Sequence, residues 1–206
     1  MEANIAALLW TVLGFVLGAM PFSYWLGRLI LQTDIRHYGD GNPGAINAWR
    51  AGGWRVGVPA MLLDYLKASV PTGVAHYIFL VSGWGLLGVA LAPVLGHAFS
   101  PFLGFRGGKA LSTTFGVWTG LTLWEGPTLL GGFLGLFYLL QKEDAWSAIL
   151  GMLAFLVYLI VQQSDYVILS IWAGNTLILT WKHRRALRCM PWPRPWISNL
   201  VKGCRQ

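Results

Sequence analysis

The chain has 206 residues, of which 55% are hydrophobic and only 11% are charged, and its mean hydropathy is positive. A soluble domain with a solvated surface does not have this composition, so we predict an all-α membrane protein. One domain, residues 1–206, suits the length, because helices of about 20 residues use up the chain. The net charge of +7 does not indicate nucleic acid, since no soluble module is left to bind it. Anionic lipid heads or phosphorylated substrates fit the charge better.

Hydropathy and turn residues predict a polytopic helix bundle of about seven transmembrane segments. In chain order, the expected spans are residues 5–31, 56–80, 84–96, 110–124, 128–141, 146–162 and 165–181. The third, fourth and fifth are shorter than the roughly 20 residues that a bilayer needs, so five spans is the competing count. Either count places the two termini on opposite sides.

Basic residues distinguish the two sides of this bundle. If the N-terminus is outside, most Lys and Arg fall in the cytoplasmic segments, which are residues 32–55, 97–109, 142–145 and 182–206. No Lys or Arg occurs in the opposite loops, which are residues 82–83, 125–127 and 162–165. We therefore expect the N-terminus outside and the C-terminus in the cytoplasm.

The first expected loop, residues 32–54, is long, polar and rich in glycine, which is typical of an ordered loop at a site. Glycines let backbone N–H groups turn around an anion, amides add donors, and arginines grip phosphate oxygens. The residues that indicate a phosphate site here are Arg36, Asn42, Gly44, Asn47 and Arg50. The alternative is a glycine-rich turn with arginines at the membrane surface.

A second loop, residues 96–114, has the same chemistry. Consecutive glycines can expose N–H groups, a lysine adds positive charge, and hydroxyls stand where the next helix begins. The candidate anion-binding residues are Gly107, Gly108, Lys109, Ser112 and Thr113. This is not a Walker A loop, because its first glycine and its Ser or Thr are missing, so we do not expect a nucleotide.

Three further polar residues fall at or inside the predicted spans. His97 is a candidate general base, although a lone histidine near a membrane boundary is more often structural. Asp64 and Lys67, three residues apart on one helix, can form an ion pair that either serves a site or anchors the bundle. The remaining histidines share no ligand spacing, so we expect no metal.

These stretches resemble the bacterial acyl-phosphate:glycerol-3-phosphate acyltransferases, which are polytopic membrane enzymes. Residues 18–24 look like the family's G-S-x-P opening, and residues 34–50 look like its D-I-R-x-x-G-S-G-N-x-G-A-x-N-x-x-R motif. Residues 64–67 are similar to its D-x-x-K-G, and residues 96–113 are similar to its G-H-x-F-x-x-F-x-x-F-K-G-G-K-G-x-x-T. The resemblance runs from the first span to about Gly116.

The resemblance implies transfer of a fatty acyl group from acyl phosphate to the 1-hydroxyl of glycerol 3-phosphate, which gives lysophosphatidate and phosphate. It implies no metal, CoA or other cofactor. The expected partners are acyl phosphate, glycerol 3-phosphate and membrane lipids. The expected location is the bacterial cytoplasmic membrane, with the active site facing the cytoplasm.

The resemblance also implies roles for single residues. One phosphate would be held by Asn42, Asn47 and Arg50, and glycerol 3-phosphate would be bound by Gly107, Gly108 and Lys109. His97 would position the hydroxyl or accept its proton, which a substrate phosphate could equally take. We therefore take His97, Arg50 and Lys109 as candidate catalytic residues and the other candidates, Asp64 and Lys67 included, as substrate-binding.

Some positions depart from the family pattern. Asp40 stands where the family has the Ser of G-S-G-N, and a carboxylate there repels a phosphate, at a cost of roughly a few kcal/mol, unless Arg36 or Arg50 neutralises it. The family's third motif survives only as His183, since Ala186 replaces its Asn. These departures leave two alternatives open, a divergent paralogue with an altered acceptor or no turnover that binds phosphorylated lipids, and a lipid-phosphate transporter.

Overall fold

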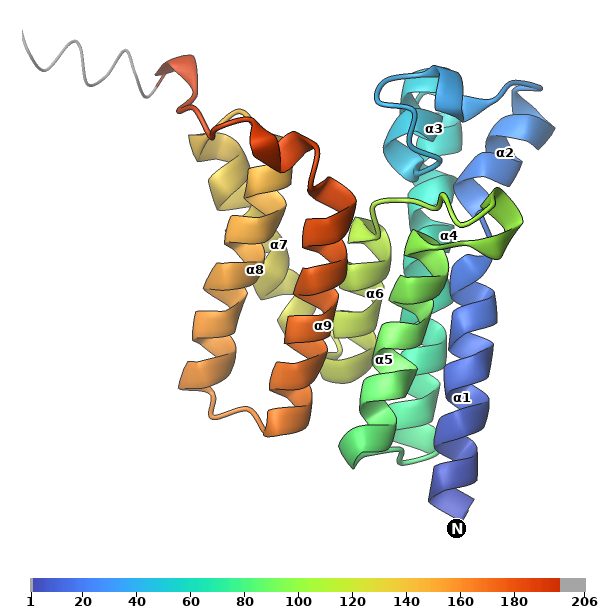
Figure 1. Ribbon diagram of the computed structural model, residues 1–206, viewed down its shortest axis with the longest axis vertical. Coiled ribbons are helices and arrows are strands. Elements are labelled where there is room, and N and C mark those ends of the chain that lie inside the picture. The colour runs from blue at the N-terminus through green and yellow to red at the C-terminus, as the bar shows by residue number, and fades with distance from the viewer. Residues whose placement is uncertain (1, 197–206) are drawn as a thin grey trace, which may run out of the picture.

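The computed structural model describes residues 2–196, and that part of the chain is helical with no β-strand (Figure 1). The long helices are α1 (Glu2–Ala19), α4 (Trp54–Gly73), α5 (Gly83–Ala98), α6 (Leu111–Thr122), α7 (Glu125–Leu140), α8 (Asp144–Val161) and α9 (Tyr166–His183). The shorter elements are α2 (Phe22–Ile30), α3 (Ala45–Gly52), a π-helical turn η2 (Val74–Ile78), and the 3-10 turns η1 (Ile35–His37), η3 (Pro101–Leu103) and η4 (Ala186–Arg188). The long helices lie side by side and run up and down in turn (Figure 1), so the predicted helix bundle is confirmed.

The first expected span, residues 5–31, is two helices rather than one. Met20 and Pro21 separate α1 from α2, because proline has no N–H to continue the helical hydrogen bonds and its ring clashes with the preceding turn. Lys67 of α4 donates a hydrogen bond of 2.8 Å to the backbone oxygen of Met20. Hydropathy missed this break because the apolar residues continue across it.

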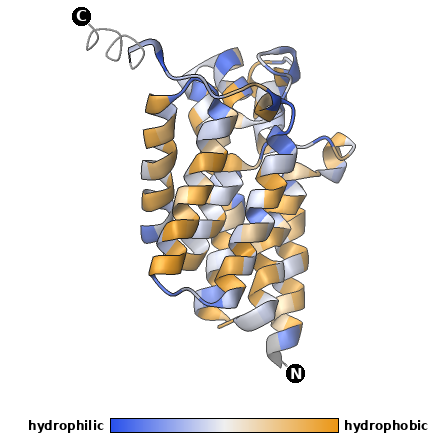
Figure 2. Cartoon of the chain, turned by 60° about the vertical axis from the view of Figure 1, so that its left-hand side comes forward, coloured by the Kyte–Doolittle hydropathy of each residue, from blue (hydrophilic) through white to orange (hydrophobic). Residues whose placement is uncertain are grey.

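The surface of the bundle suits a lipid environment. Within residues 2–196, the stretches Asn4–Ile30, Gly83–Leu103 and Asp144–Val161 are long and apolar enough to cross a membrane, and α7 is a shorter apolar helix. Large hydrophobic side chains such as Val161 stay exposed on the long helices. Hydrophobic residues line these helices, and most hydrophilic segments gather at the upper end (Figure 2). The protein therefore belongs in a membrane, whereas the count of seven spans stays a prediction.

The segments predicted to share one side of the membrane lie together at that hydrophilic end (Figure 1). The backbone N–H of Lys142, between α7 and α8, donates to the oxygen of Trp192 after α9, at 3.0 Å. From the end of α9, Lys182 Nζ donates to the oxygen of Gly107, before α6, at 2.9 Å. The last part of the fourth segment, residues 197–206, lies outside the described residues.

Glycines bring α1 and α5 unusually close together. A Cβ added to Gly18 would lie 2.3 Å from the oxygen of Pro93, and one added to Gly96 would lie 2.3 Å from the oxygen of Phe15. Small residues allow such close helix crossings in membrane proteins. This contact places His97, the neighbour of Gly96, against the upper end of α1.

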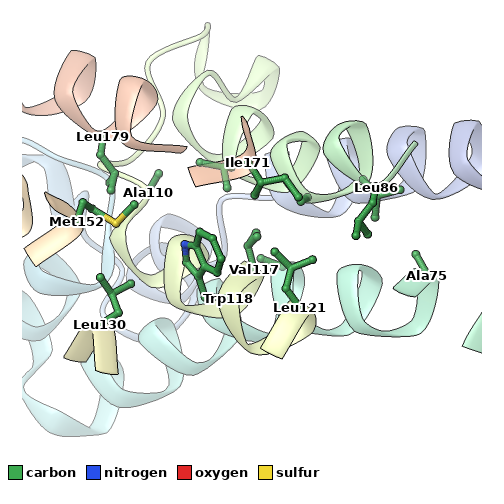
Figure 3. Close-up of a cluster of buried hydrophobic side chains, with 14 of the residues drawn as sticks. Ala75, Leu86, Ala110, Val117, Trp118, Leu121, Leu130, Met152, Ile171 and Leu179 are labelled. Atoms are coloured by element: carbon green, nitrogen blue, oxygen red, sulfur yellow. The ribbon is translucent and has the colours of Figure 1, made fainter. Parts of the chain in front are cut away.

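A buried aromatic pair supports the helices beneath the second loop. Trp118 of α6 and Phe155 of α8 are fully buried and meet edge to face, with ring centroids 4.7 Å apart. Figure 3 shows Trp118 at the centre of the apolar cluster, with Met152 on one side and Leu121 on the other. The cluster gives α6, which carries the end of the second loop, a rigid base.

The close contact of α1 with α5 predicts that Gly18→Ala destabilises the protein. The added methyl meets the backbone at Pro93 rather than a side chain that can turn away, so the helices must separate, at a cost of about 1–3 kcal/mol. The measurement is the thermal unfolding midpoint in detergent. Gly132→Ala on α7 is the control, because nothing lies within 4 Å of its Cβ position. Equal midpoints for both variants would contradict the prediction.

Candidate functional site

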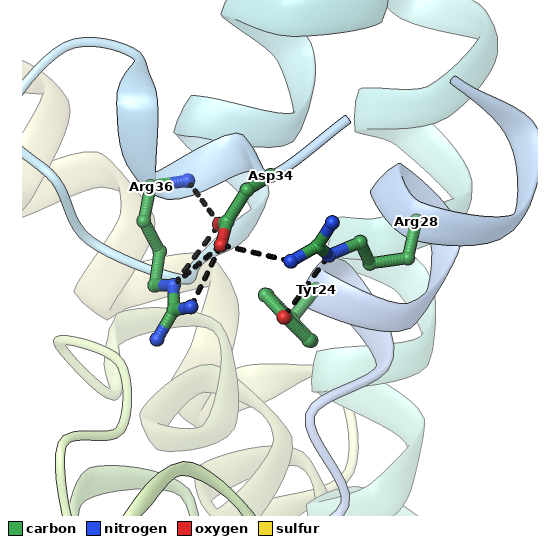
Figure 4. A network of polar contacts seen from close by, with 4 residues as sticks. All are labelled: Tyr24, Arg28, Asp34 and Arg36. Carbon is green, nitrogen blue, oxygen red and sulfur yellow. Dashed lines mark hydrogen bonds and ion pairs between the residues drawn. The ribbon is translucent and has the colours of Figure 1, made fainter. Parts of the chain in front are cut away.

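Two arginines converge on Asp34 at the start of the first loop (Figure 4). The Oδ1 atom of Asp34 accepts hydrogen bonds of 3.0 Å from both the backbone N–H and Nε of Arg36, and its Oδ2 accepts one of 2.7 Å from Arg36 Nη2. Arg28 Nη2 lies 3.4 Å from the same Oδ2. Both guanidinium groups lie over the ring of Tyr24, at 4.9 Å for Arg36 and 5.5 Å for Arg28. Arg36, a predicted substrate-binding residue, is thus engaged in bracing its own loop.

The carboxylate of Asp40 lies between the two loops. Its Oδ1 accepts hydrogen bonds from Asn47 Nδ2 at 2.9 Å and from the backbone N–H of Asn42 at 3.2 Å. Its Oδ2 forms an ion pair of 2.6 Å with Lys109 Nζ of the second loop. Burial acts to raise the pKa of Asp40, but the hydrogen bond and charge of Lys109, together with the hydrogen bonds from Asn42 and Asn47, hold the pKa below its ordinary value. The ion pair brings the two loops together.

Arg50 contacts this loop without reaching the carboxylate. Its Nη1 donates to the Oδ1 atom of Asn47 at 3.2 Å. Gly39, with φ at +57°, makes room for that contact, because a Cβ there would lie 1.9 Å from Arg50 Nη1. The ion-pair partner of Asp40 is thus Lys109 of the other loop, rather than Arg36 or Arg50, the two residues considered from the sequence.

Gly44 and Asn42 complete the first loop. Gly44 is the N-cap residue of α3, and a Cβ there would lie 2.9 Å from the Oδ1 atom of Asn42. Besides its hydrogen bond to Asp40, Asn47 Nδ2 donates one of 2.9 Å to the backbone oxygen of Asn42. Asn47 is almost completely buried, so its amide is held in place by the loop around it.

In the second loop, Gly107 and Gly108 pack directly on His97. A Cβ on Gly107 would lie 2.0 Å from the oxygen of His97, and one on Gly108 would lie 2.1 Å from His97 Nε2. The N–H of Gly108 donates to the oxygen of His97 at 3.0 Å. Both glycines therefore serve close packing, and Lys182, which was not predicted, anchors them through the oxygen of Gly107. The only signal for Lys182 in the sequence is its place beside His183 in the weakened third motif.

Two predicted residues of the second loop lie apart from these contacts. Thr113 is fully buried, and its hydroxyl donates to the oxygen of Ala110 at 2.8 Å within the first turn of α6. Ser112 is half-buried beside it. Neither side chain lines the cavity described below.

The predicted ion pair between Asp64 and Lys67 is present and buried. Asp64 Oδ1 lies 2.7 Å from Lys67 Nζ and 3.7 Å from His97 Nδ1. Asp64 Oδ2 accepts a hydrogen bond of 2.6 Å from Ser23 of α2. Ser23 was not predicted, although it follows Pro21 closely in the opening motif. The pair therefore connects α4 to α2 and to the histidine of α5.

A small cavity lies where these groups meet. It is lined by, among others, Met20, Pro43, Asp64, Lys67, His97 and Gly108. The cavity brings the candidate base, the ion pair and the second loop under Pro43 of the first loop. Residues 2–196 hold no group of three or more His, Cys, Asp or Glu side chains that could bind a metal ion.

The sequence model of the family described as glycerol-3-phosphate acyltransferase matches residues 8–190. The chain belongs to the glycerol-3-phosphate acyltransferase family. A glycerol-3-phosphate acyltransferase 1 of Thermotoga maritima is 40% identical to it over 190 residues, covering 84% of this chain and 92% of that protein. A glycerol-3-phosphate acyltransferase of Listeria welshimeri is 33% identical over 191 residues, covering 88% and 91%.

Solved structures of this acyltransferase family have the same fold. The crystal structure of PlsY, described as an integral membrane glycerol 3-phosphate acyltransferase, matches in its glycerol 3-phosphate form with a TM-score of 0.79 and 27% identity, covering 96% of this chain and 92% of that one. Its lysophosphatidic acid form matches with a TM-score of 0.77. The family that the sequence motifs indicated is therefore confirmed.

The network at Asp34 predicts a loss of stability in acid. The hydrogen bond from Arg36 is the main cause that lowers the pKa of Asp34 from 3.8 to about 2. Because the folded-state pKa lies below the unfolded value, the carboxylate stabilises the fold by about 2 kcal/mol above pH 5, and this contribution is lost as the pH falls from 4 toward 2.

The measurement is the unfolding midpoint of the wild type and of Asp34→Asn between pH 7 and pH 2.5. We expect the variant to be less stable at pH 7 and the difference to shrink below pH 4. Asp144→Asn, which removes an exposed carboxylate at the same end of the bundle, is the control. A wild type and an Asp34→Asn variant of equal stability at pH 7 would refute this interpretation.

Proposed function

We propose that this protein transfers a fatty acyl group from acyl phosphate to the 1-hydroxyl of glycerol 3-phosphate, releasing lysophosphatidate and phosphate. Family membership and the names of the two relatives support the enzyme class and the acceptor. The forms in which PlsY was solved, with glycerol 3-phosphate and with lysophosphatidic acid, match the proposed acceptor and product. The observation that carries the proposal is the meeting of two glycine-containing loops, joined through Lys109, beside a cavity that contains His97.

The proposed reaction is a direct acyl transfer. The oxygen of the 1-hydroxyl forms a bond to the acyl carbonyl carbon, the bond from that carbon to the phosphate oxygen breaks, and phosphate leaves with the electron pair. The hydroxyl proton passes either to His97 or to a phosphate oxygen of a substrate. Because phosphate is a good leaving group, positioning and charge stabilisation supply most of the catalysis, and no covalent enzyme intermediate is needed.

The positive groups of the two loops are assigned to the substrate phosphates. Lys109 and Arg50 carry the charge, as lysine and arginine do at phosphate sites, and Asn47 adds an amide donor. Lys109 is half-exposed and Arg50 is exposed, so a substrate can reach both from the aqueous face. The two glycines before Lys109, packed on His97, set its distance from the candidate base.

The buried residues are assigned a positioning role. Asp64 and Lys67 line the cavity and hold the region where α1 gives way to α2, through Met20 and Ser23. Asp64 also lies close enough to His97 to orient its imidazole. A charge pair inside a membrane helix is costly and usually functional, which supports a positioning role for Asp64 and Lys67.

We propose that the site faces the cytoplasm, with the N-terminus outside and seven spans. The two loops and most of the basic side chains share one end of the bundle, and membrane proteins concentrate Lys and Arg on the cytoplasmic side. Acyl phosphate then enters from the bilayer, and glycerol 3-phosphate enters from the aqueous side. The alternatives of a binding-only paralogue and of a lipid-phosphate transporter are not favoured, since both relatives are named as acyltransferases.

The proposed reaction is tested with purified protein in detergent, palmitoyl phosphate and glycerol 3-phosphate. We expect phosphate and lysophosphatidate to appear in equal amounts, with lysophosphatidate measured by mass spectrometry. Omission of the acceptor should abolish lysophosphatidate, and Arg50→Ala should lower turnover strongly while the protein stays folded. Phosphate release without lysophosphatidate, or no turnover by folded wild-type protein, would overturn the proposal.

Lys109→Met should lower kcat/KM by about 100-fold, the effect of losing roughly 3 kcal/mol of charge stabilisation at a phosphate. Steady-state kinetics with both substrates varied in turn provide the measurement. Lys142→Met is the matched control, because Lys142 is an exposed lysine at the same end of the bundle but lies between α7 and α8. Similar kinetic effects of the two substitutions would remove Lys109 from the site.

A further inference from the structure

The groups that would bind a phosphate oxygen hold a carboxylate of the chain instead. Asp40 accepts from the N–H of Asn42 at 3.2 Å and from the amide of Asn47 at 2.9 Å, and it pairs with Lys109 at 2.6 Å. A backbone N–H, a side-chain amide and an ammonium group are the donors that proteins use for phosphate. We call these three donors the anion cradle.

The side-chain amide of the anion cradle does not depend on Asp40 for its position. The amide of Asn47 also donates to the backbone oxygen of Asn42, and its own oxygen accepts from Arg50. Because Asn47 is buried, these contacts keep its amide in place when its acceptor changes. The cradle can therefore exchange one anion for another.

Asp40 itself is free to leave. Its side chain is 44% exposed and that of Lys109 is 38% exposed, so their separation buries no new charge. Asp40 stands between Gly39, with φ at +57°, and Gly41, with φ at +73°. Glycine tolerates large changes of backbone angle, so this short segment has the backbone freedom to turn outward.

We propose that Asp40 is an internal competitor for substrate phosphate: it occupies the anion cradle of the unliganded protein, and a phosphate group must displace it from Lys109 and Asn47. A carboxylate that stays near a bound phosphate repels it, so binding is weaker than it would be without Asp40. Asp40 thereby sets the substrate concentration at which the protein works. The proposal rests on the proposed function only for the identity of the phosphate carrier, which is either acyl phosphate or glycerol 3-phosphate.

A bracing role for Asp40 makes the opposite prediction. If the carboxylate holds the two loops in the binding geometry, its loss separates them and weakens phosphate binding. Asp40→Asn distinguishes the two roles because it removes the charge but keeps an oxygen that can accept from Asn42 and Asn47. Asp40→Ser is a second variant that removes both the charge and most of the side chain.

The first measurement is binding of inorganic phosphate and of glycerol 3-phosphate to full-length protein in detergent by titration calorimetry. We expect Asp40→Asn and Asp40→Ser to bind both ligands about tenfold more tightly than the wild type, as removal of one adjacent like charge predicts. Asp144→Asn removes an exposed carboxylate elsewhere at the same end and should leave binding unchanged. In the Lys109→Met background, Asp40→Asn should change the affinity for phosphate by a different factor than it does in the otherwise wild-type protein, because the two residues are coupled.

The second measurement separates the two phosphate carriers. In turnover assays, Asp40→Asn should lower KM for one substrate, with a smaller change in kcat, and the substrate whose KM falls is the one that displaces Asp40. The binding of phosphate is measured without an acyl donor, so it does not depend on turnover. Tighter binding by the variants with no turnover in any protein would therefore overturn the proposed function and leave this inference standing.

The competing role of Asp40 is overturned if folded Asp40→Asn and Asp40→Ser proteins bind phosphate as weakly as the wild type or more weakly. Unfolding of both variants would overturn it as well, since Asp40 would then be a structural brace. Thermal unfolding midpoints of each variant accompany the binding data for this reason.

Discussion

The fold around the cavity depends on the buried ion pair of Asp64 and Lys67, because from α4 these two side chains contact α2, the break after α1, and α5. Through Ser23 and Met20 it fixes both sides of the break between α1 and α2, and it faces His97 of α5. Breaking a buried charge pair by removing one partner costs about 3–5 kcal/mol, since the other charge stays uncompensated. The pair thus stabilises the fold around the cavity, and it also forms part of the surroundings of the candidate base His97.

Two carboxylates of the first loop form ion pairs at the hydrophilic end. Asp34 is paired with Arg36, and Asp40 is paired with Lys109. Each pair joins segments that would otherwise be loose: the first folds the start of its loop onto itself, and the second links two loops that are far apart in the sequence. The difference lies in exposure, because Asp34 is buried while Asp40 and Lys109 stay open to solvent. The first pair is therefore suited to bracing the site and the second to exchanging partners with a substrate.

The glycines of the two loops serve different purposes. Gly107 and Gly108 have no side chain because His97 occupies the space, so they fix the distance between the second loop and the histidine. Gly39 leaves room for Arg50, and Gly41 adds a second left-handed position beside Asp40. The glycines of the second loop therefore serve close packing, and those of the first loop supply left-handed backbone conformations on both sides of Asp40.

Much of the protein could be predicted from the sequence. Composition determined the all-helical membrane class, and the spacing of Asp64 and Lys67 determined their ion pair, because both depend on local or average properties. The motifs determined the family.

Proline at position 21 gives the break after Met20 a local cause, which the continuous apolar pattern conceals from hydropathy, but the tertiary structure decided that Lys67 anchors it. It also decided that Lys109, and neither Arg36 nor Arg50, pairs with Asp40. The partner of a charge in a loop depends on which distant segments the helix packing brings together, and no spacing along the chain records that. The anchoring of the second loop by Lys182 has the same physical origin, since it requires α9 to lie beside the end of α5.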